Sequence, residues 1–376
     1  MRNNFDQGND DFTSRFLYDV IDEKPNASVI TSPFSVLFLL SQLALYAKGK
    51  TYEQLANLLN LNKRNDIRST IPQYLDEINS QRNVNFSLAE RVFGSIDYPF
   101  SKSFKRDTKL TFHAQARNLD FSEPKEAAKE INSWIASQTN DLIKDLISPS
   151  ALDENTRLVL TNAIYFKGDW KIPFNSKKTR LQTFHVTNRR KSSVKMMNQI
   201  GHFNYGYIED IQSKVVQMFY KNENFSFLSI LPNKRHSVHS VADQLQDLDL
   251  QYDVINNLDS ARVNLSIPVI HTESSTDLAD ILKKNGVTAL FNSSSSDLSG
   301  ILMYPEPLYV SSAIQKAKII VNEAGSEAAA ANAAVIKTKA AIVENTLETF
   351  NADRPFLYYV LFENAPVFAG LYAGQQ

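Results

Sequence analysis

Histidines are the residues of this sequence best suited to bind a metal ion or to transfer a proton near neutral pH. The chain has six of them: His113, His185, His202, His236, His239 and His271. His236 and His239 are three residues apart, so they would lie on one face of a helix and could share a metal ion. No carboxylate-containing helix motif accompanies the pair. We therefore interpret them as surface residues and predict no metal site.

The residue patterns of nucleophilic and nucleotide-dependent enzymes are absent from the sequence. There is no cysteine, which excludes a thiolate nucleophile, thiolate metal ligands and disulfides. No Gly-X-Ser-X-Gly nucleophile turn and no phosphate-binding loop occurs. The sequence therefore predicts a protein that is not an enzyme and that needs no cofactor.

Composition and charge also limit the partners that we expect. The 376 residues carry a net charge of −1, and 43% of them are hydrophobic, which is ordinary globular composition. A chain of near-zero net charge is not expected to bind nucleic acid as its main role. The longest apolar run, residues 36–44, is too short to span a bilayer, so no membrane partner is predicted.

The order of the expected elements predicts an α+β fold. Asp11 can cap a first helix, and Ser32 can cap a second one that starts at Pro33 and ends at Gly49. Further helices are expected at residues 66–79 and 125–147. The expected strands are 157–165, 194–197, 213–220, 226–231, 262–267, 314–321, 356–362 and 367–372. Helices come first and long antiparallel strands follow, which is typical of the α+β class.

An alanine-rich stretch at residues 323–342 is the segment best suited to carry a function. Alanine propensity alone favours an exposed helix. However, the alanine block has no large apolar residue before Val335, it lies between two strands, and no proline occurs between residues 308 and 354. These properties suit a segment that enters a β-sheet, because proline would remove a ladder hydrogen bond and small side chains avoid overpacking. Gly325 would give the backbone freedom at the pivot.

Residues 322–331 resemble the hinge signature of the serpin family. Other serpin-like blocks occur in the same order and cover essentially the whole chain. They are residues 32–35, 161–170, 174, 183–185, 194–197, 297–300 and 350–356. The resemblance implies a single domain over residues 1–376, with about nine helices around three β-sheets and an exposed, mobile reactive-centre loop at about 323–349. It also implies a monomer.

The resemblance implies a suicide inhibitor of serine proteases. The loop would be cleaved as a substrate and would then insert into the main sheet, trapping the acyl-enzyme. The residue before the cleaved bond lies fourteen after the hinge glycine in this family, which gives Lys339, followed by Ala340. A lysine there implies a trypsin-like target with an acidic specificity pocket. Lys337 is the alternative reactive residue.

Two other activities stay open at this point. A hinge of this type also occurs in serpins that inhibit papain-like cysteine proteases, and other serpins are non-inhibitory carriers or chaperones. Non-inhibitory members often have bulky, charged or proline residues in the hinge, which argues against that alternative here. The hinge residues of this chain are Glu323, Gly325, Ser326, Glu327, Ala328, Ala329, Ala330 and Ala331.

The resemblance also implies a polar cluster beneath the sheet, where the sheet opens. Its members would be Ser32, Ser35, Asn162 and Gln315. Gln315 stands where the family commonly has histidine. Because an amide both donates and accepts hydrogen bonds, we expect a retained network that is less sensitive to pH.

Two basic clusters raise the question of a heparin-like polyanion, which some serpins bind. One is Lys102, Lys105, Arg106 and Lys109, and the other is Arg189, Arg190 and Lys191. A solvated surface is the simpler interpretation of both clusters, and a glycosaminoglycan partner is the alternative.

The opening of the sequence is polar and has no secretory signal before Phe12. The chain is therefore either cytoplasmic or a mature secreted form with an added Met1. Asn-X-Ser sequons occur at Asn26, Asn85, Asn224, Asn264 and Asn292. Together with a resemblance to extracellular serpins of arthropods, they favour a secreted glycoprotein, with innate immunity as the expected setting.

Overall fold

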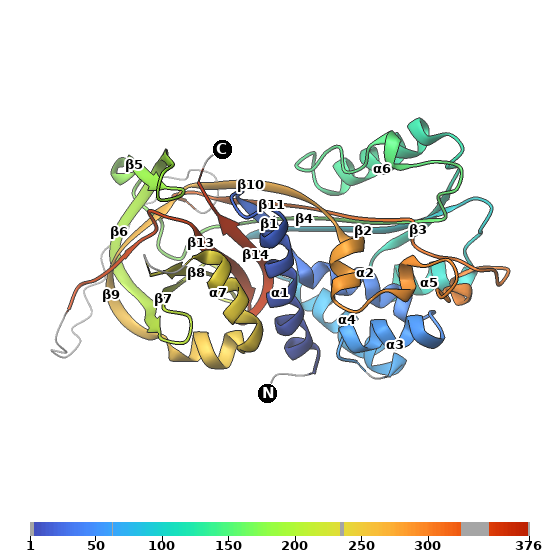
Figure 1. Ribbon diagram of the computed structural model, residues 1–376, viewed down its shortest axis with the longest axis horizontal. Helices are drawn as coiled ribbons and strands as arrows, with labels where there is room; N and C mark the ends of the chain where they lie inside the picture. Colours follow the sequence, from blue (N-terminus) through green and yellow to red (C-terminus); the bar gives the residue numbers. More distant parts are fainter. Residues whose placement is uncertain (1–3, 62, 234–236, 325–345, 375–376) are drawn as a thin grey trace.

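The computed structural model describes residues 4–61, 63–233, 237–324 and 346–374. Its α-helices are α1 (Asn4–Glu23), α2 (Pro33–Ala44), α3 (Gly49–Leu58), α4 (Arg64–Asn79), α5 (Lys102–Thr111), α6 (Pro124–Gln138), α7 (Val238–Gln244) and α8 (Leu278–Lys284). A π-helix at Leu250–Val254 and six 3-10 helices of three residues each complete the helices of these described ranges. Figure 1 shows an elongated molecule in which long strands run between the two ends. The α+β class is confirmed.

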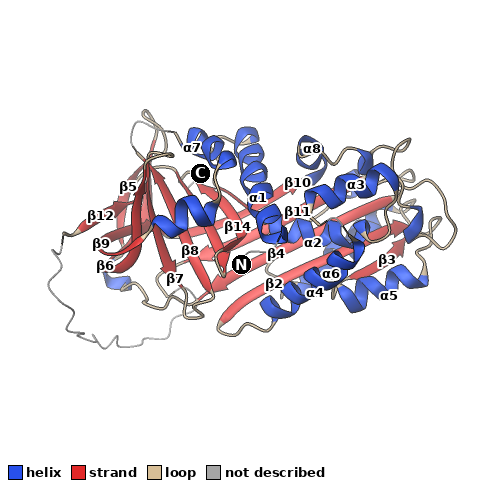
Figure 2. Ribbon diagram, turned by 90° about the horizontal axis from the view of Figure 1, so that it is seen from below, coloured by secondary structure: helices blue, strands red, loops and turns tan. Residues whose placement is uncertain are grey.

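A five-stranded sheet crosses most of the molecule (Figure 2). Its strands are ordered β10-β11-β4-β2-β3. Their bounds are β2 (Val84–Ser95), β3 (Gln115–Leu119), β4 (Leu158–Gly168), β10 (Ile270–Asp277) and β11 (Ser312–Val321). At its centre β11 and β4 are parallel, whereas β10 and β2 pair antiparallel to them. A second parallel pair, β2 with β3, lies at one edge, so β11–β4 is the parallel pair with antiparallel neighbours on both sides.

The two faces of this sheet are covered by different helices, and α6 and α2 lie on opposite sides of it (Figure 1). On the outer face, Ile135 of α6 and Ile143 pack on Ala163 and Tyr165 of β4. On the inner face, Leu160 and Ile164 of β4 join the main core. Because side chains alternate along a strand, neighbouring residues of β4 and β11 serve opposite layers.

The second sheet has nine strands in the order β1-β14-β13-β8-β7-β6-β9-β12, with β5 paired to β6. Their bounds are β1 (Val29–Thr31), β5 (Arg180–His185), β6 (Lys191–Ile208), β7 (Ser213–Phe219), β8 (Phe225–Pro232), β9 (Asp259–Pro268), β12 (Glu348–Asn351), β13 (Phe356–Phe362) and β14 (Ala365–Tyr372). β6 pairs with β5, β7 and β9 along its 18 residues. This long strand joins two of the three expected sheets into one.

Each predicted element overlaps an observed helix or strand, but several helix ends differ, and the strand predicted at 194–197 is a short part of β6. Ser32 caps α2 and Pro33 is its first residue, as expected. However, α2 ends at Ala44, and Gly49 begins α3 instead. The helix predicted at 125–147 ends at Gln138, because Asn140 and the residue after it adopt left-handed backbone angles.

The first helix also begins earlier than predicted. Asp11 lies inside α1, which starts at Asn4. The first of about two extra turns is held by Phe5, which is buried and stacks on Phe38 of α2 with ring centroids 6.0 Å apart. Burial of this aromatic ring outweighs the capping preference of Asp11.

Candidate functional site

The alanine-rich segment leaves the five-stranded sheet at the end of β11, and its base is fixed there. The Trp170 amide donates to the carbonyl oxygen of Ala324 at 3.1 Å, and the Phe174 amide donates to that of Glu323 at 2.8 Å. The Glu323 carboxylate accepts a hydrogen bond from Thr179 Oγ1 at 2.7 Å. The indole of Trp170 also donates to the carbonyl oxygen of Asn322 at 2.8 Å. The segment is thus anchored up to Ala324.

Most of the residues expected to act on a protease lie outside the described residues. They are Gly325, Ser326, Glu327, Ala328, Ala329, Ala330, Ala331, Lys337, Lys339 and Ala340. The chain is described again from residue 346, and β12 then pairs with β9 in the nine-stranded sheet. The segment therefore connects the centre of one sheet to the edge of the other.

The pairing of β11 with β4 defines where a new strand would fit. The two strands are parallel from the Ser312–Val159 pair to the Ile319–Phe166 pair. A segment that turns back after β11 would run antiparallel to β11, and therefore antiparallel to β4 as well. Insertion would replace one parallel ladder by two antiparallel ladders, which are more stable per residue. The sheet thus contains a position that favours an added strand.

A buried polar cluster lies directly beneath that position, and it brings together Ser32, Ser35, Asn162 and Gln315. The Gln315 side-chain amide donates to the Ser32 carbonyl at 2.8 Å, to Asn162 Oδ1 at 3.0 Å and to Ser35 Oγ at 3.2 Å. Ser35 Oγ donates to Asn162 Oδ1 at 2.8 Å. These bonds link α2 to β4 and β11, so separating the two strands would break them.

Gln315 also accepts two hydrogen bonds within the cluster. Its Oε1 accepts from the Ser32 amide at 2.9 Å and from Thr31 Oγ1 at 2.7 Å. Ser32 Oγ donates in turn to the carbonyl oxygen of Val367 in β14 at 2.7 Å. All four predicted members of the cluster are completely buried. The network therefore joins both sheets to the start of α2.

Sequence reasoning missed Glu90, which belongs to the same cluster. Glu90 Oε1 accepts from Asn162 Nδ2 at 3.0 Å, and its Oε2 accepts from Gln42 Nε2 at 3.3 Å. Burial raises the pKa of Glu90 well above its usual value, and the hydrogen bonds from Asn162 and Gln42 only partly oppose this shift. Among the described residues, no charged side chain contributes to the shift. The presence of Gln315 led us to expect a polar network with low sensitivity to pH. Glu90 adds a titratable carboxyl group to that network.

On the outer face, two lysines of β11 hold the connection that follows α6. Lys316 Nζ donates to the carbonyl oxygen of Lys144, and Lys318 Nζ donates to that of Leu142 at 2.9 Å. Both ammonium groups also pair with Glu273 of β10 at 3.0 Å. The connection from α6 to β4 is therefore tied across the β11–β4 pair.

We expect the double substitution Lys316→Met and Lys318→Met to lower the free energy of unfolding by about 1–3 kcal/mol, because charge-assisted hydrogen bonds to partly buried groups are lost. Urea unfolding followed by circular dichroism measures the change. Lys129→Met in α6 is the control, because Lys129 forms only an exposed pair with Glu126. Equal urea midpoints for the double variant and the control would contradict this assignment.

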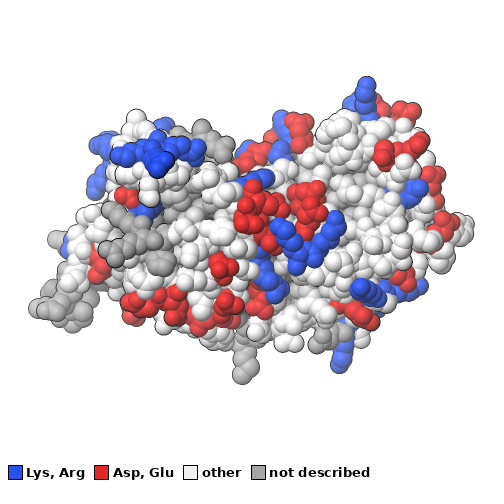
Figure 3. Space-filling view, in the orientation of Figure 1, with Lys and Arg blue, Asp and Glu red and all other residues white. Residues whose placement is uncertain are grey.

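The two basic clusters differ in their surroundings. In the α5 cluster, Arg106 pairs with Asp107 at 3.2 Å, and Asp107 also binds Arg68 at 2.9 Å. In the other cluster, Arg189 and Arg190 are exposed in the turn between β5 and β6, and Lys191 is exposed at the start of β6. Within the described part of the chain these three residues form no ion pair. Figure 3 shows Lys and Arg gathered over this end of the molecule.

The described residues include only one member of the predicted histidine pair. His236 lies outside the described residues, and His239 pairs with Asp22 at 3.1 Å. In the described ranges, no three His, Asp or Glu side chains are grouped so that they could hold a metal ion. None of the helices in those ranges has the length and apolar character needed to cross a membrane.

Comparisons with known proteins give one consistent result. The family model described as "Serpin (serine protease inhibitor)" matches residues 7–373. The chain is 33% identical to antichymotrypsin-2 of Bombyx mori, over 97% of this chain and 96% of that protein. It is 32% identical to antitrypsin of Bombyx mori, over 97% and 93%.

Solved structures agree with this result. The crystal structure of Serpin48, described as a highly specific serpin in the insect Tenebrio molitor, has a TM-score of 0.89 and 28% identity, and the match covers 99% of this chain and 98% of that one. Native protease nexin-1 with heparin has a TM-score of 0.88 and 27% identity, with 99% of each chain covered.

Proposed function

The chain belongs to the serpin family, and from that premise we propose that it is a suicide-substrate inhibitor of trypsin-like serine proteases. Relatives of the chain are named as inhibitors of proteases, and it is an inhibitor of this kind rather than an enzyme. The observation that carries the proposal is the parallel β11–β4 pair, because the segment that starts at the end of β11 would enter between these strands as an antiparallel strand.

The proposed reaction begins as ordinary proteolysis. The protease serine attacks the carbonyl carbon of Lys339, the bond to Ala340 breaks, and the new amino group leaves with the C-terminal part of the chain. The acyl-enzyme ester is then carried along as the cleaved segment adds to the sheet. Insertion would move the protease away from the start of the segment and distort its catalytic groups before water hydrolyses the ester.

The specificity in this proposal rests on the count from Gly325 to Lys339. A lysine before the cleaved bond complements the acidic pocket of a trypsin-like protease. The names of the relatives do not favour one target, because they include an antitrypsin, an antichymotrypsin and a leukocyte elastase inhibitor. Inhibition of a papain-like cysteine protease, and a non-inhibitory carrier or chaperone role, remain the competing functions.

Incubation with trypsin, chymotrypsin and papain tests the proposal. We expect a complex with trypsin that survives boiling in detergent and migrates at the combined mass of the two proteins. A stable complex with papain instead would establish the cross-class alternative. Cleavage without a complex for all three proteases would overturn the inhibitory proposal and leave the carrier or chaperone role.

We also propose that a heparin-like polyanion would bind the turn between β5 and β6 rather than α5. Arg189, Arg190 and Lys191 are exposed and unpaired among the described residues, whereas Asp107 partly neutralises the α5 cluster. Heparin is present in the structure of protease nexin-1.

The triple alanine variant of Arg189, Arg190 and Lys191 is expected to elute from heparin resin at lower salt, because exposed charges act through screened electrostatics. Alanine variants of Lys102, Lys105 and Lys109 form the matched control and are expected to elute like the native protein. The opposite order of elution would place the polyanion on α5, and no retention of the native protein would exclude it.

A further inference from the structure

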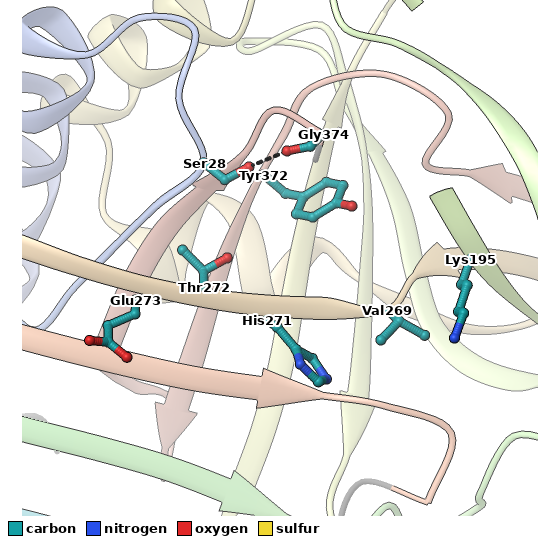
Figure 4. Close-up of a pocket in the computed structure, with 8 residues that line it drawn as sticks. All are labelled: Ser28, Lys195, Val269, His271, Thr272, Glu273, Tyr372 and Gly374. Atoms are coloured by element: carbon teal, nitrogen blue, oxygen red, sulfur yellow. Dashed lines mark hydrogen bonds between the residues drawn. The ribbon is translucent and has the colours of Figure 1, made fainter. Parts of the chain in front are cut away.

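A cavity of about 500 Å³ lies at the β10 edge of the five-stranded sheet (Figure 4). Its walls come from the start of β10, from β6 and from the end of β14 and the residues that follow it. Ser28 Oγ fixes one wall, because it donates to the carbonyl oxygen of Gly374 at 2.9 Å and accepts from the Ala373 amide at 2.9 Å. A cavity of this volume is large enough for a small organic molecule.

Lys195 gives this cavity a positive charge, and His271 adds a second one only when its imidazole is protonated. Lys195 and His271 line the cavity, and neither forms an ion pair in the described part of the chain. Burial lowers the pKa of His271, and the nearby charges of Lys318, Lys167 and Lys195 lower it further. Among the described residues, Glu273 is the only acidic residue in the lining, and Lys316 and Lys318 already neutralise it at 3.0 Å each. The remaining charge favours an anion.

Tyr372 supplies an independent indication of a ligand. Its side chain is only 3% exposed, and its hydroxyl group has no hydrogen-bond partner among the described residues. Burial raises the pKa of Tyr372 to about 12, so the hydroxyl group stays a donor at neutral pH. In Figure 4 this hydroxyl points away from Ser28, toward the side of the cavity where Val269 and Lys195 lie. A buried donor without a partner costs free energy that a bound acceptor would recover.

We propose that this cavity binds a small organic anion, with its negative group between Lys195, His271 and the hydroxyl of Tyr372. The Val269 side chain and the ring of Tyr372 would contact an apolar body, because both line the same space. A carboxylate with a short hydrocarbon or aromatic body has this combination of properties. None of the lining residues belongs to the segment that a protease would cleave.

Isothermal titration with sodium octanoate and sodium benzoate tests the site, with octanol and inorganic phosphate as probes that lack the charge and the apolar body respectively. We expect saturable binding of at least one carboxylate, with lower affinity for octanol and phosphate. Affinity should increase as the pH falls and His271 gains its proton. Saturable binding of octanol as strong as that of octanoate would reject an anion site.

Two conservative substitutions locate the binding. Tyr372→Phe keeps the ring and removes only the hydroxyl, so we expect about tenfold weaker carboxylate binding or more. Tyr359→Phe is the matched control, because Tyr359 is also buried with an unpartnered hydroxyl among the described residues but does not line the cavity. Lys195→Gln is expected to weaken binding as well, whereas Lys178→Gln is not, because Lys178 is exposed and does not line the cavity. Equal affinities for Tyr372→Phe and the native protein would overturn the proposal.

Discussion

The substitution Lys339→Glu is expected to slow the inhibition of trypsin by at least about 100-fold. Placing two like charges together in an interface costs several kcal/mol, and each 1.4 kcal/mol corresponds to a factor of ten. The acidic pocket of a trypsin-like protease would repel the new carboxylate, while the hinge at residues 323–331 stays unchanged. The second-order rate constant of inhibition, measured with a chromogenic substrate, gives the result.

Lys337→Glu is the matched control for this prediction. It has the same charge change two residues earlier, and we expect it to retain most of the inhibition rate. The opposite outcome, with Lys337→Glu inactive and Lys339→Glu active, would move the cleaved bond to the carboxyl side of Lys337. Mass spectrometry of the C-terminal fragment, separated by denaturing the complex, identifies the bond directly.

Glu90→Gln is expected to stabilise the native protein at neutral and alkaline pH. Burial raises the pKa of Glu90 in the folded protein well above its ordinary value of 4.5. Between these two pKa values the folded protein keeps a proton on Glu90 that the unfolded chain has released. Stability is therefore lost as the pH rises from the ordinary value to the raised folded pKa, with a slope of up to about 1.4 kcal/mol per pH unit. Glutamine keeps the shape and the acceptor for Asn162 without the ionisation.

Urea midpoints of the native protein and the variant, measured from pH 5 to pH 8.5, test this prediction. We expect the difference between them to grow with pH. Glu273→Gln provides a control of opposite sign, because Lys316 and Lys318 lower the pKa of Glu273 despite partial burial. The ionised Glu273 carboxylate stabilises the fold at pH values above its ordinary pKa. This stabilisation is lost as the pH falls through the lowered pKa of the folded protein. Parallel curves of urea midpoint against pH for the native protein and Glu90→Gln would show that the ionisation of Glu90 does not change the stability of the fold.

Much of the fold could be predicted from local patterns, and the failures have identifiable causes. The apolar helix α2 and the β-type strands of the second half were found, because burial and capping leave clear signals in short windows. β2 was missed, because Glu90 and Arg91 interrupt its apolar run. β10 was missed because seven of its eight residues, all except Ile270, are polar, which suits an edge strand.

The site was predictable to a similar extent. Motif resemblance named Ser32, Ser35, Asn162 and Gln315, and the structure places them in one hydrogen-bonded cluster. Glu90 and Gln42 could not be found in this way, because their roles depend on partners 72 and 48 residues away in the chain. Nor does any local pattern show that the hydroxyl of Tyr372 would be buried without a partner.

The position of the two tryptophans has a practical consequence for spectroscopy. Trp134 of α6 contacts Arg91 of β2, with the guanidinium carbon 4.0 Å from the ring centroid. Trp170 stacks on Tyr220 at 4.4 Å, and its indole donates to the carbonyl oxygen of Asn322. An added strand would widen the sheet by about 4.8 Å. It would thus change the surroundings of both fluorophores, since one covers the sheet and the other holds the base of the segment.

The chain has no other tryptophan, so its intrinsic emission divides into only two contributions. A variant with Trp134 replaced by phenylalanine would report on the base of the segment alone, and the Trp170 replacement would report on α6 alone. Stopped-flow emission from these two variants would time the release of the anchor separately from the displacement of the helix. The two native tryptophans therefore allow the steps of the rearrangement to be timed without an attached dye.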